Sequence, residues 1–169
     1  MSKLRVILSL IAILLLQILV CNHINIAGGV NPYIYVAFVF VFPLSQNRFF
    51  PLLFAFLFGL SVDFFSDTGG IHAFSLVLIC YLRLFFLRLF FRKSEFDFLL
   101  FNLHQEAFGK VFNYVLVVTF LHHFVMFSLA NFSLKNMTDV LLSTLYATVF
   151  TVGLYFLGSF LFRRKLEVR

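Results

Sequence analysis

The chain has 169 residues, of which 62% are hydrophobic and only 12% are charged, and its formal net charge is +6. This composition is too apolar for a surface that faces water on all sides, which excludes a soluble globular protein and predicts an integral membrane protein. No polar segment is long enough to bury a core of its own, so we expect a single membrane domain over residues 1–169.

Six stretches are predicted to cross the membrane, because one helical crossing needs about 20 apolar residues. In chain order they are residues 6–21, 31–44, 49–65, 70–91, 111–130 and 140–162. Lys3 and Arg5 ahead of the first stretch would also fit a cleaved signal sequence, but Val20 stands where a cleavage site needs a small residue. The predicted fold class is therefore an all-α bundle of six transmembrane helices with an uncleaved first span.

The second span is the shortest of the six. Its apolar part, residues 33–44, would cover only about 18 Å of a hydrocarbon core that is about 30 Å thick. A full crossing therefore requires that residues 24–32 also lie at membrane depth.

The basic residues are distributed unevenly over the loops. If the N-terminus is cytoplasmic, the outer loops hold only Lys135, and the inner segments hold Lys3, Arg5, Arg48, Arg92, Lys93, Lys110, Arg163, Arg164, Lys165 and Arg169. This asymmetry predicts that both termini lie in the cytoplasm. It also explains the positive net charge without a nucleic-acid partner.

A helix on the membrane surface is predicted between the fourth and fifth spans, over residues 94–108. Ser94 and Asp97 have the spacing of a capping box, and Gly109 suits a helix end. Such a helix could be a simple connector or a docking surface for a cytoplasmic partner.

Asp63 and His72 lie on either side of the turn between the third and fourth spans. If this turn is centred near residues 67–68, the two side chains have similar depths on antiparallel helices and can meet. A carboxylate inside a membrane needs a partner, here His72 or nearby serine hydroxyls. The alternative is that Asp63 lies in the headgroup zone and only caps the turn.

Arg83 lies deeper in the fourth span than Arg88. It is about 13 Å along the helix from Arg92, and it is about 18 Å farther from the turn than Asp63, so the two cannot pair in a straight hairpin. Its counter-charge would come from Glu106, a lipid headgroup, backbone carbonyls or another protein. The alternative is a side chain that reaches the inner membrane surface.

The remaining polar and small residues predict helix packing. His122 and His123 point about 100° apart on a helix and cannot share one metal ion well. Gly59, Gly153 and Gly158 offer small surfaces for close helix contact. No motif of a serine hydrolase, zinc protease or nucleotide-binding loop occurs, so we expect no catalytic residue, metal or cofactor.

The stretch between the third and fourth spans carries the pattern G-x-x-x-D-x-x-S-x-x-x-G-x-H-A, and an arginine follows in the next apolar helix. The positions are Gly59, Asp63, Ser66, Gly70, His72 and Ala73, with Arg83 farther on. This pattern resembles the signature of the rod shape-determining protein MreD family. Chain length, the number of spans, the basic ends and a hairpin between Pro43 and Pro51 agree with that family.

The resemblance implies a six-helix bundle similar to the substrate-binding subunits of energy-coupling-factor transporters. It also implies a place in the bacterial inner membrane, in the cell-wall elongation machinery, with MreC as partner and with MreB and the wall-synthesis enzymes in the wider complex. We therefore expect a non-enzymatic scaffold that supports cell-shape control.

Two surfaces are candidates for contact with a partner of this scaffold. One is formed by Gly59, Asp63, Gly70 and His72, and the other by Gly153, Gly158 and Ser159. The competing function is a substrate-binding membrane subunit of a small-molecule transporter. That function requires a closed pocket with several convergent polar groups, of which the sequence offers few.

Overall fold

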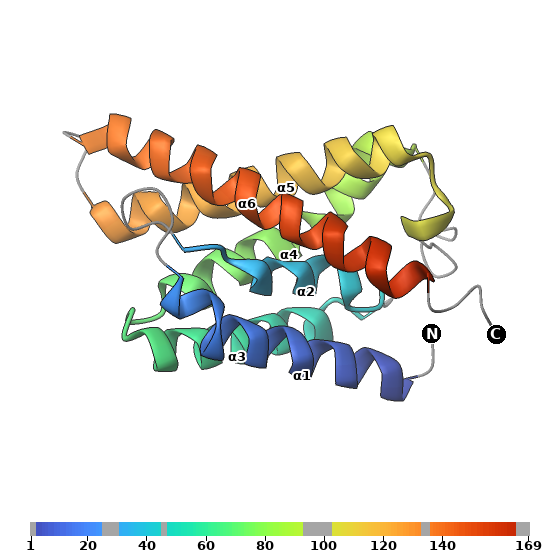
Figure 1. Cartoon of the computed structure of the whole chain (residues 1–169), viewed down its shortest axis with the longest axis horizontal. Coiled ribbons are helices and arrows are strands. Elements are labelled where there is room, and N and C mark those ends of the chain that lie inside the picture. Colours follow the sequence, from blue (N-terminus) through green and yellow to red (C-terminus); the bar gives the residue numbers. More distant parts are fainter. Residues whose placement is uncertain (1–2, 25–30, 45–46, 93–102, 133–135, 165–169) are drawn as a thin grey trace.

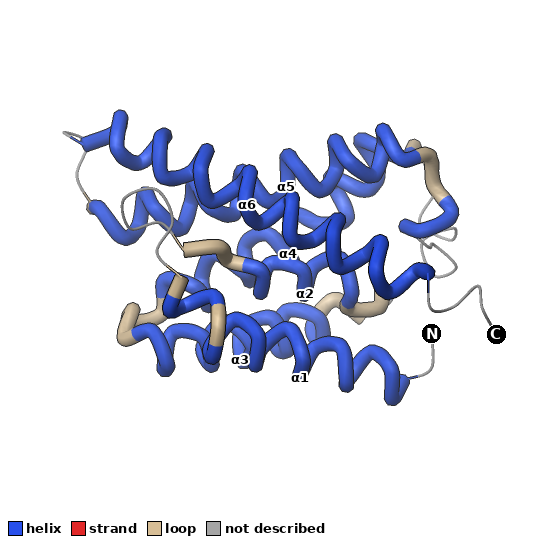
Figure 2. Tube along the Cα trace, in the orientation of Figure 1, coloured by secondary structure: helices blue, strands red, loops and turns tan. Residues whose placement is uncertain are grey.

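The computed structural model describes residues 3–24, 31–44, 47–92, 103–132 and 136–164 (Figure 1). All regular elements in these residues are helical, and none of them is a strand (Figure 2). Five helices in this part of the chain are long and apolar enough to cross a membrane. They are α1 (Lys3–Leu19), α3 (Phe49–Ser66), α4 (Ile71–Phe91), α5 (Phe108–Asn131) and α6 (Met137–Arg164). An all-α, multi-pass membrane protein is therefore confirmed.

The predicted bounds of the long helices are close to the observed ones. Helices α3 and α4 match within one residue at each end, whereas α5 and α6 each begin three residues earlier than predicted. Gly109 is the second residue of α5, so its expected place at the end of a preceding helix is wrong. Most of the predicted surface helix lies outside the described residues, and its described part contains the 3-10 turn η4 (Leu103–Gln105).

The second predicted span does not form a long helix. Residues 31–33 are irregular, and they are followed by the 3-10 helix η2 (Ile34–Ala37) and the four-residue α2 (Phe38–Val41). This short segment runs along the middle of the bundle (Figure 1) and contacts α1, α4 and α6. Tyr35, Val36, Ala37, Phe38 and Val39 are at most 4% exposed. Six full-length membrane helices are therefore not confirmed.

The short segment nevertheless connects the two ends of the bundle. Helix α1 begins at the same end of the bundle at which α6 finishes (Figure 1). Five helices that alternate in direction would instead begin and finish at opposite ends. The Tyr33 ring lies 5.6 Å from the His123 ring in α5, and Pro43 lies near Arg83 of α4. Residues 31–44 therefore make a sixth passage, of which only eight residues are helical.

Buried side chains of α1 and α6 bind the backbone of the short segment. The Tyr35 N–H donates to Gln17 Oε1 at 3.2 Å, and Gln17 Nε2 donates to the Pro32 carbonyl at 3.3 Å. The Tyr33 N–H donates to Thr151 Oγ1 at 3.1 Å. Non-helical backbone at membrane depth is tolerated only where protein groups satisfy it, and Gln17 and Thr151 do so here.

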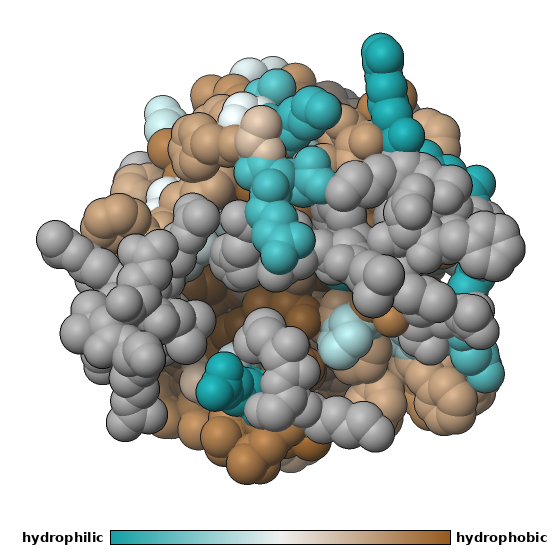
Figure 3. All heavy atoms as spheres, turned by 90° about the vertical axis from the view of Figure 1, so that its right-hand side faces the viewer, coloured by the Kyte–Doolittle hydropathy of each residue, from teal (hydrophilic) through white to brown (hydrophobic). Residues whose placement is uncertain are grey.

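The bundle has two chemically different ends. We call the end at which α3 turns into α4 the turn end, and the opposite end, where α1 and α5 begin, the basic end. Arg48, Arg92 and Lys110 are exposed at the basic end. Figure 3 looks at this end and shows hydrophilic side chains in teal among hydrophobic ones in brown.

Candidate functional site

The motif at the turn end begins with a close approach of α3 to α4. Gly59 is buried, and a Cβ atom added to it would lie 2.5 Å from the Ala73 Cα and 2.9 Å from the His72 carbonyl oxygen. These neighbours are backbone atoms and cannot rotate away. Gly59 is therefore required for packing within the chain, and it cannot belong to a surface that contacts a partner.

Asp63 caps α4 across the turn. The N-cap position of α4 is Gly70, which has no side chain and adopts a φ of 98°. Asp63 supplies the missing acceptor, because its Oδ1 accepts the His72 N–H at 3.0 Å and its Oδ2 accepts the Ala73 N–H at 2.7 Å. These are the second and third amides of the helix, which a capping side chain normally binds.

The same carboxylate binds two side chains. His72 Nδ1 lies 3.0 Å from Asp63 Oδ1, and Thr68 Oγ1 donates to that oxygen at 2.6 Å. Because a carboxylate only accepts, the contact with Asp63 favours the proton of His72 on Nδ1. The structure thus contains the expected pairing, and Asp63 is only 4% exposed, which excludes a solvated turn cap.

Ser66 links this hairpin to the end of α1. Its Oγ accepts a hydrogen bond from Asn22 Nδ2 at 3.0 Å, and Asn22 Oδ1 accepts one from Gln17 Nε2 at 2.8 Å. Through Gln17 the chain of contacts continues to the Tyr35 backbone. The polar motif residues of α3 are therefore bound to other parts of the same chain.

The two adjacent histidines of α5 contact different elements, as their positions on a helix predict. His122 Nε2 lies 2.9 Å from the Tyr35 hydroxyl, and His123 Nδ1 lies 3.1 Å from Thr148 Oγ1 in α6. Both imidazoles are fully buried. These contacts join α5 to the short segment and to α6, which is polar helix packing. No group of three metal-binding side chains occurs in the described residues.

Aromatic rings fill the space between these polar groups. The His72 ring lies 5.7 Å from Tyr33 and 5.4 Å from Tyr35, and the His122 and His123 rings are 5.3 Å apart. We call these five residues, together with Asp63, the turn-end network. Its polar groups converge more than the sequence suggested. Most of them contact one another, whereas His122 Nδ1 and His123 Nε2 have no hydrogen-bond partner in the described residues.

The proposed docking surface of Gly59, Asp63, Gly70 and His72 is therefore wrong for three of its members. Gly59, Asp63 and His72 are buried inside the chain, and only Gly70 is half-buried. The second surface is open. Gly153 is exposed and Gly158 is half-buried on α6, and an added Cβ at either glycine would meet no atom within 4 Å.

Arg83 lies far from the turn-end network, as the sequence predicts, but it is less deep than its own helix suggests. The Cys80 thiol donates to the Pro51 carbonyl at 3.7 Å, which places the first turn of α3 beside Cys80. The next turn of α4 brings Arg83 level with Arg48, the N-cap of α3. Helix α4 continues for two turns beyond the level at which α3 starts, and Arg92 lies at the end of this extension. The distance from Arg92 therefore overestimates the depth of Arg83.

Several residues of the turn-end site were not identified from the sequence. Gln17 is the only amide side chain in the first apolar run, and that isolation was the available signal. Thr68 was considered only as part of the turn. Tyr33 and Tyr35 lie in a span that was read as plain apolar helix, and no local pattern indicates that they contact the histidines.

Comparison with known proteins adds no relative: no protein-family model, curated protein or solved structure matches the chain. The resemblance to the MreD family therefore depends on the motif residues themselves. Their contacts in the structure show that the motif fixes the α3–α4 hairpin.

Proposed function

We propose that the chain is a non-enzymatic membrane scaffold of the MreD kind, which binds a single-span partner such as MreC in a bacterial cell-wall elongation complex. The observation that carries this proposal is the internal use of the motif. Asp63, Ser66 and His72 all bind other parts of the chain, so the polar groups build a rigid bundle and are not available to a substrate. MreB and the wall-synthesis enzymes would belong to the wider complex.

The surface of α6 around Gly153 is the proposed contact with the partner. Helices associate in lipid through close packing at small residues, because lipid provides no hydrophobic drive between them. The open space beside Gly153 would admit the backbone of a partner helix. Gly158 lies five residues farther on and points about 140° away around α6, so it does not belong to the same contact. The proposed location is the bacterial inner membrane, with six crossings and both termini in the cytoplasm, which the distribution of basic residues supports.

Affinity purification in mild detergent, with identification of the co-purifying proteins, tests this proposal. Gly153→Leu should reduce recovery of a single-span partner by about tenfold or more, which corresponds to about 1.4 kcal/mol of lost association energy. Gly109→Leu is the matched control, because Gly109 is also an exposed helical glycine with no atom within 4 Å of an added Cβ.

Equal recovery with both variants would contradict the proposed surface. The transporter function would be favoured if the purified wild-type protein also bound a small molecule and this binding required the turn-end network. The convergence of Asp63, His72 and His122 keeps that second function testable, although the rings of Tyr33 and Tyr35 would have to move to admit a substrate.

A further inference from the structure

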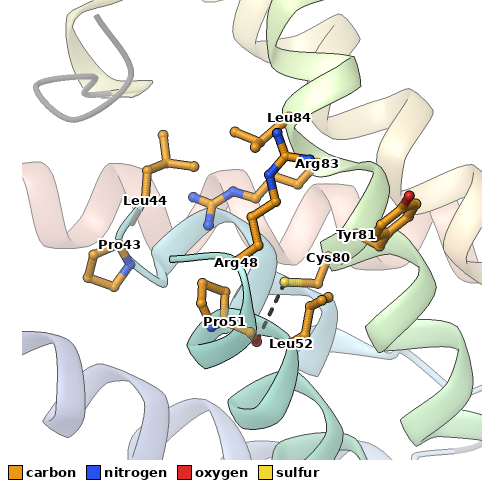
Figure 4. A pocket seen from close by; sticks show the side chains of 9 residues that line it. All are labelled: Pro43, Leu44, Arg48, Pro51, Leu52, Cys80, Tyr81, Arg83 and Leu84. Carbon is orange, nitrogen blue, oxygen red and sulfur yellow. Dashed lines mark hydrogen bonds between the residues drawn. The ribbon is translucent and has the colours of Figure 1, made fainter. Parts of the chain in front are cut away.

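A pocket at the basic end lies between the connection from α2 to α3 and the second half of α4 (Figure 4). Its walls include Pro43, Leu44 and Pro51 from the connection and from α3, and Cys80 from α4. Two arginine side chains, Arg48 and Arg83, enter it from opposite walls (Figure 4). We call this site the arginine pocket.

Arg83 is the buried cation of the arginine pocket. Arg83 is only 6% exposed, and its Nε atom makes no hydrogen bond within the described residues. A guanidinium carries five N–H donors and no acceptor, and a buried donor without a partner is unfavourable. Arg83 therefore combines an unused, buried Nε donor with a side chain that lines the pocket.

Arg48 adds a second positive charge to the same pocket. It is the N-cap residue of α3, where the helix dipole also favours a negative charge. No Asp or Glu is among the described residues that line the pocket. Two guanidinium groups thus line one small space, and this arrangement favours an anion with several acceptor oxygens.

The level of the pocket in the membrane indicates where this anion comes from. Helix α3 has 18 residues and is therefore about 27 Å long, close to the thickness of the hydrocarbon core of about 30 Å. Its first residue thus lies near the edge of that core. Arg83 is level with this residue, at the depth where lipid phosphates begin.

We propose that the arginine pocket binds a phosphate group, and that the headgroup of an anionic phospholipid in the adjacent leaflet supplies it. The planar fork of an arginine matches two phosphate oxygens, so Arg83 and Arg48 would hold the group from two sides. The apolar surface of Leu44 and Leu52 lies beside the same pocket, where the acyl chains of that lipid would continue. This inference is independent of the scaffold proposal, because it involves neither α6 nor a protein partner.

Native mass spectrometry of the detergent-purified full chain tests the inference with three probes: phosphatidylglycerol, phosphatidylcholine and inorganic phosphate. The wild-type protein should retain phosphatidylglycerol in preference to phosphatidylcholine. Arg83→Gln should reduce this retention by about tenfold, which is the effect of losing one charge-assisted contact of about 1.4 kcal/mol. Arg88→Gln is the matched control, since Arg88 is exposed on the same helix and does not line the pocket.

The arms of the experiment separate the sources of phosphate. If inorganic phosphate binds in a way that depends on Arg83, and phosphatidylglycerol is not preferred, the ligand is a free anion and not a lipid. Equal retention of phosphatidylglycerol by Arg83→Gln, Arg88→Gln and wild type would overturn the site. If Arg83→Gln does not fold, Arg48→Gln decides the question, because Arg48 is exposed and its replacement leaves no buried gap.

Discussion

Replacement of Asp63 by asparagine tests the hydrogen bonds that hold the α3–α4 hairpin. The carboxylate accepts from four donors: the Thr68 hydroxyl, the His72 N–H, His72 Nδ1 and the Ala73 N–H. The asparagine side chain has one acceptor oxygen and one NH2 group. In either orientation of this amide, the NH2 group must therefore face a donor. The better orientation keeps the contacts of Oδ1 and places two N–H groups against each other at Ala73.

The expected loss follows from this single unmatched contact. A buried donor without a partner lowers the free energy of unfolding by about 1 to 3 kcal/mol. For a chain of this size that change lowers the midpoint of thermal unfolding by about 2 to 12 °C. Asp63→Ala removes all four acceptor contacts, so it should lower the free energy of unfolding by at least as much as Asp63→Asn, about 1 to 3 kcal/mol or more.

Thermal unfolding in detergent, with hydrogen exchange at the Ala73 amide, measures the effect. Asp67→Asn is the matched control, because Asp67 is exposed and asparagine tolerates its left-handed φ of 54°. The reasoning is refuted if Asp63→Asn and Asp67→Asn unfold at the same temperature, or if the Ala73 amide exchanges equally slowly in both.

Two further predictions concern the short segment and the topology. Gln17→Leu should lower the free energy of unfolding by about 1 to 3 kcal/mol, because it leaves the buried Tyr35 N–H without an acceptor. Thermal unfolding measures this loss. Gln105→Leu is the exposed control, and an equal effect of both variants would contradict the prediction. For the topology, a cysteine that replaces Lys135 should react with an impermeant thiol reagent from outside the cell, and one that replaces Arg169 should not. Reaction at both positions would exclude a cytoplasmic C-terminus.

The long helices could be predicted because the lipid environment alone requires them. A segment that crosses lipid must form its backbone hydrogen bonds internally, so length and apolar content locate α3 and α4 to within one residue. Residues 31–44 do not obey this rule, because Gln17 and Thr151 satisfy part of their backbone. Those partners lie far away in the sequence, and no local pattern reveals them.

The role of Asp63 was predicted only in part, because pairing with His72 and capping of the turn were treated as alternatives. The structure combines them, since one carboxylate has room for about four donors. Gly70 could have indicated the cap, because a glycine at the N-cap leaves the first amides of α4 without a side-chain acceptor. That inference needs the exact helix start, which sequence patterns locate only approximately.

An ionisable residue inside a membrane segment is usually taken as a sign of function. In this chain, the hydrogen-bonding state of each residue separates two roles. Asp63 has all four of its acceptor contacts filled by Thr68, His72 and Ala73, so it stabilises the bundle and is not available to a ligand. Arg83 is almost as buried, but its Nε donor has no partner in the described structure. His122 and His123 also have one unpartnered nitrogen each, but neither of them lines the pocket. An unused donor together with a place in the pocket wall therefore makes the arginine pocket the better candidate for binding a molecule from outside the chain.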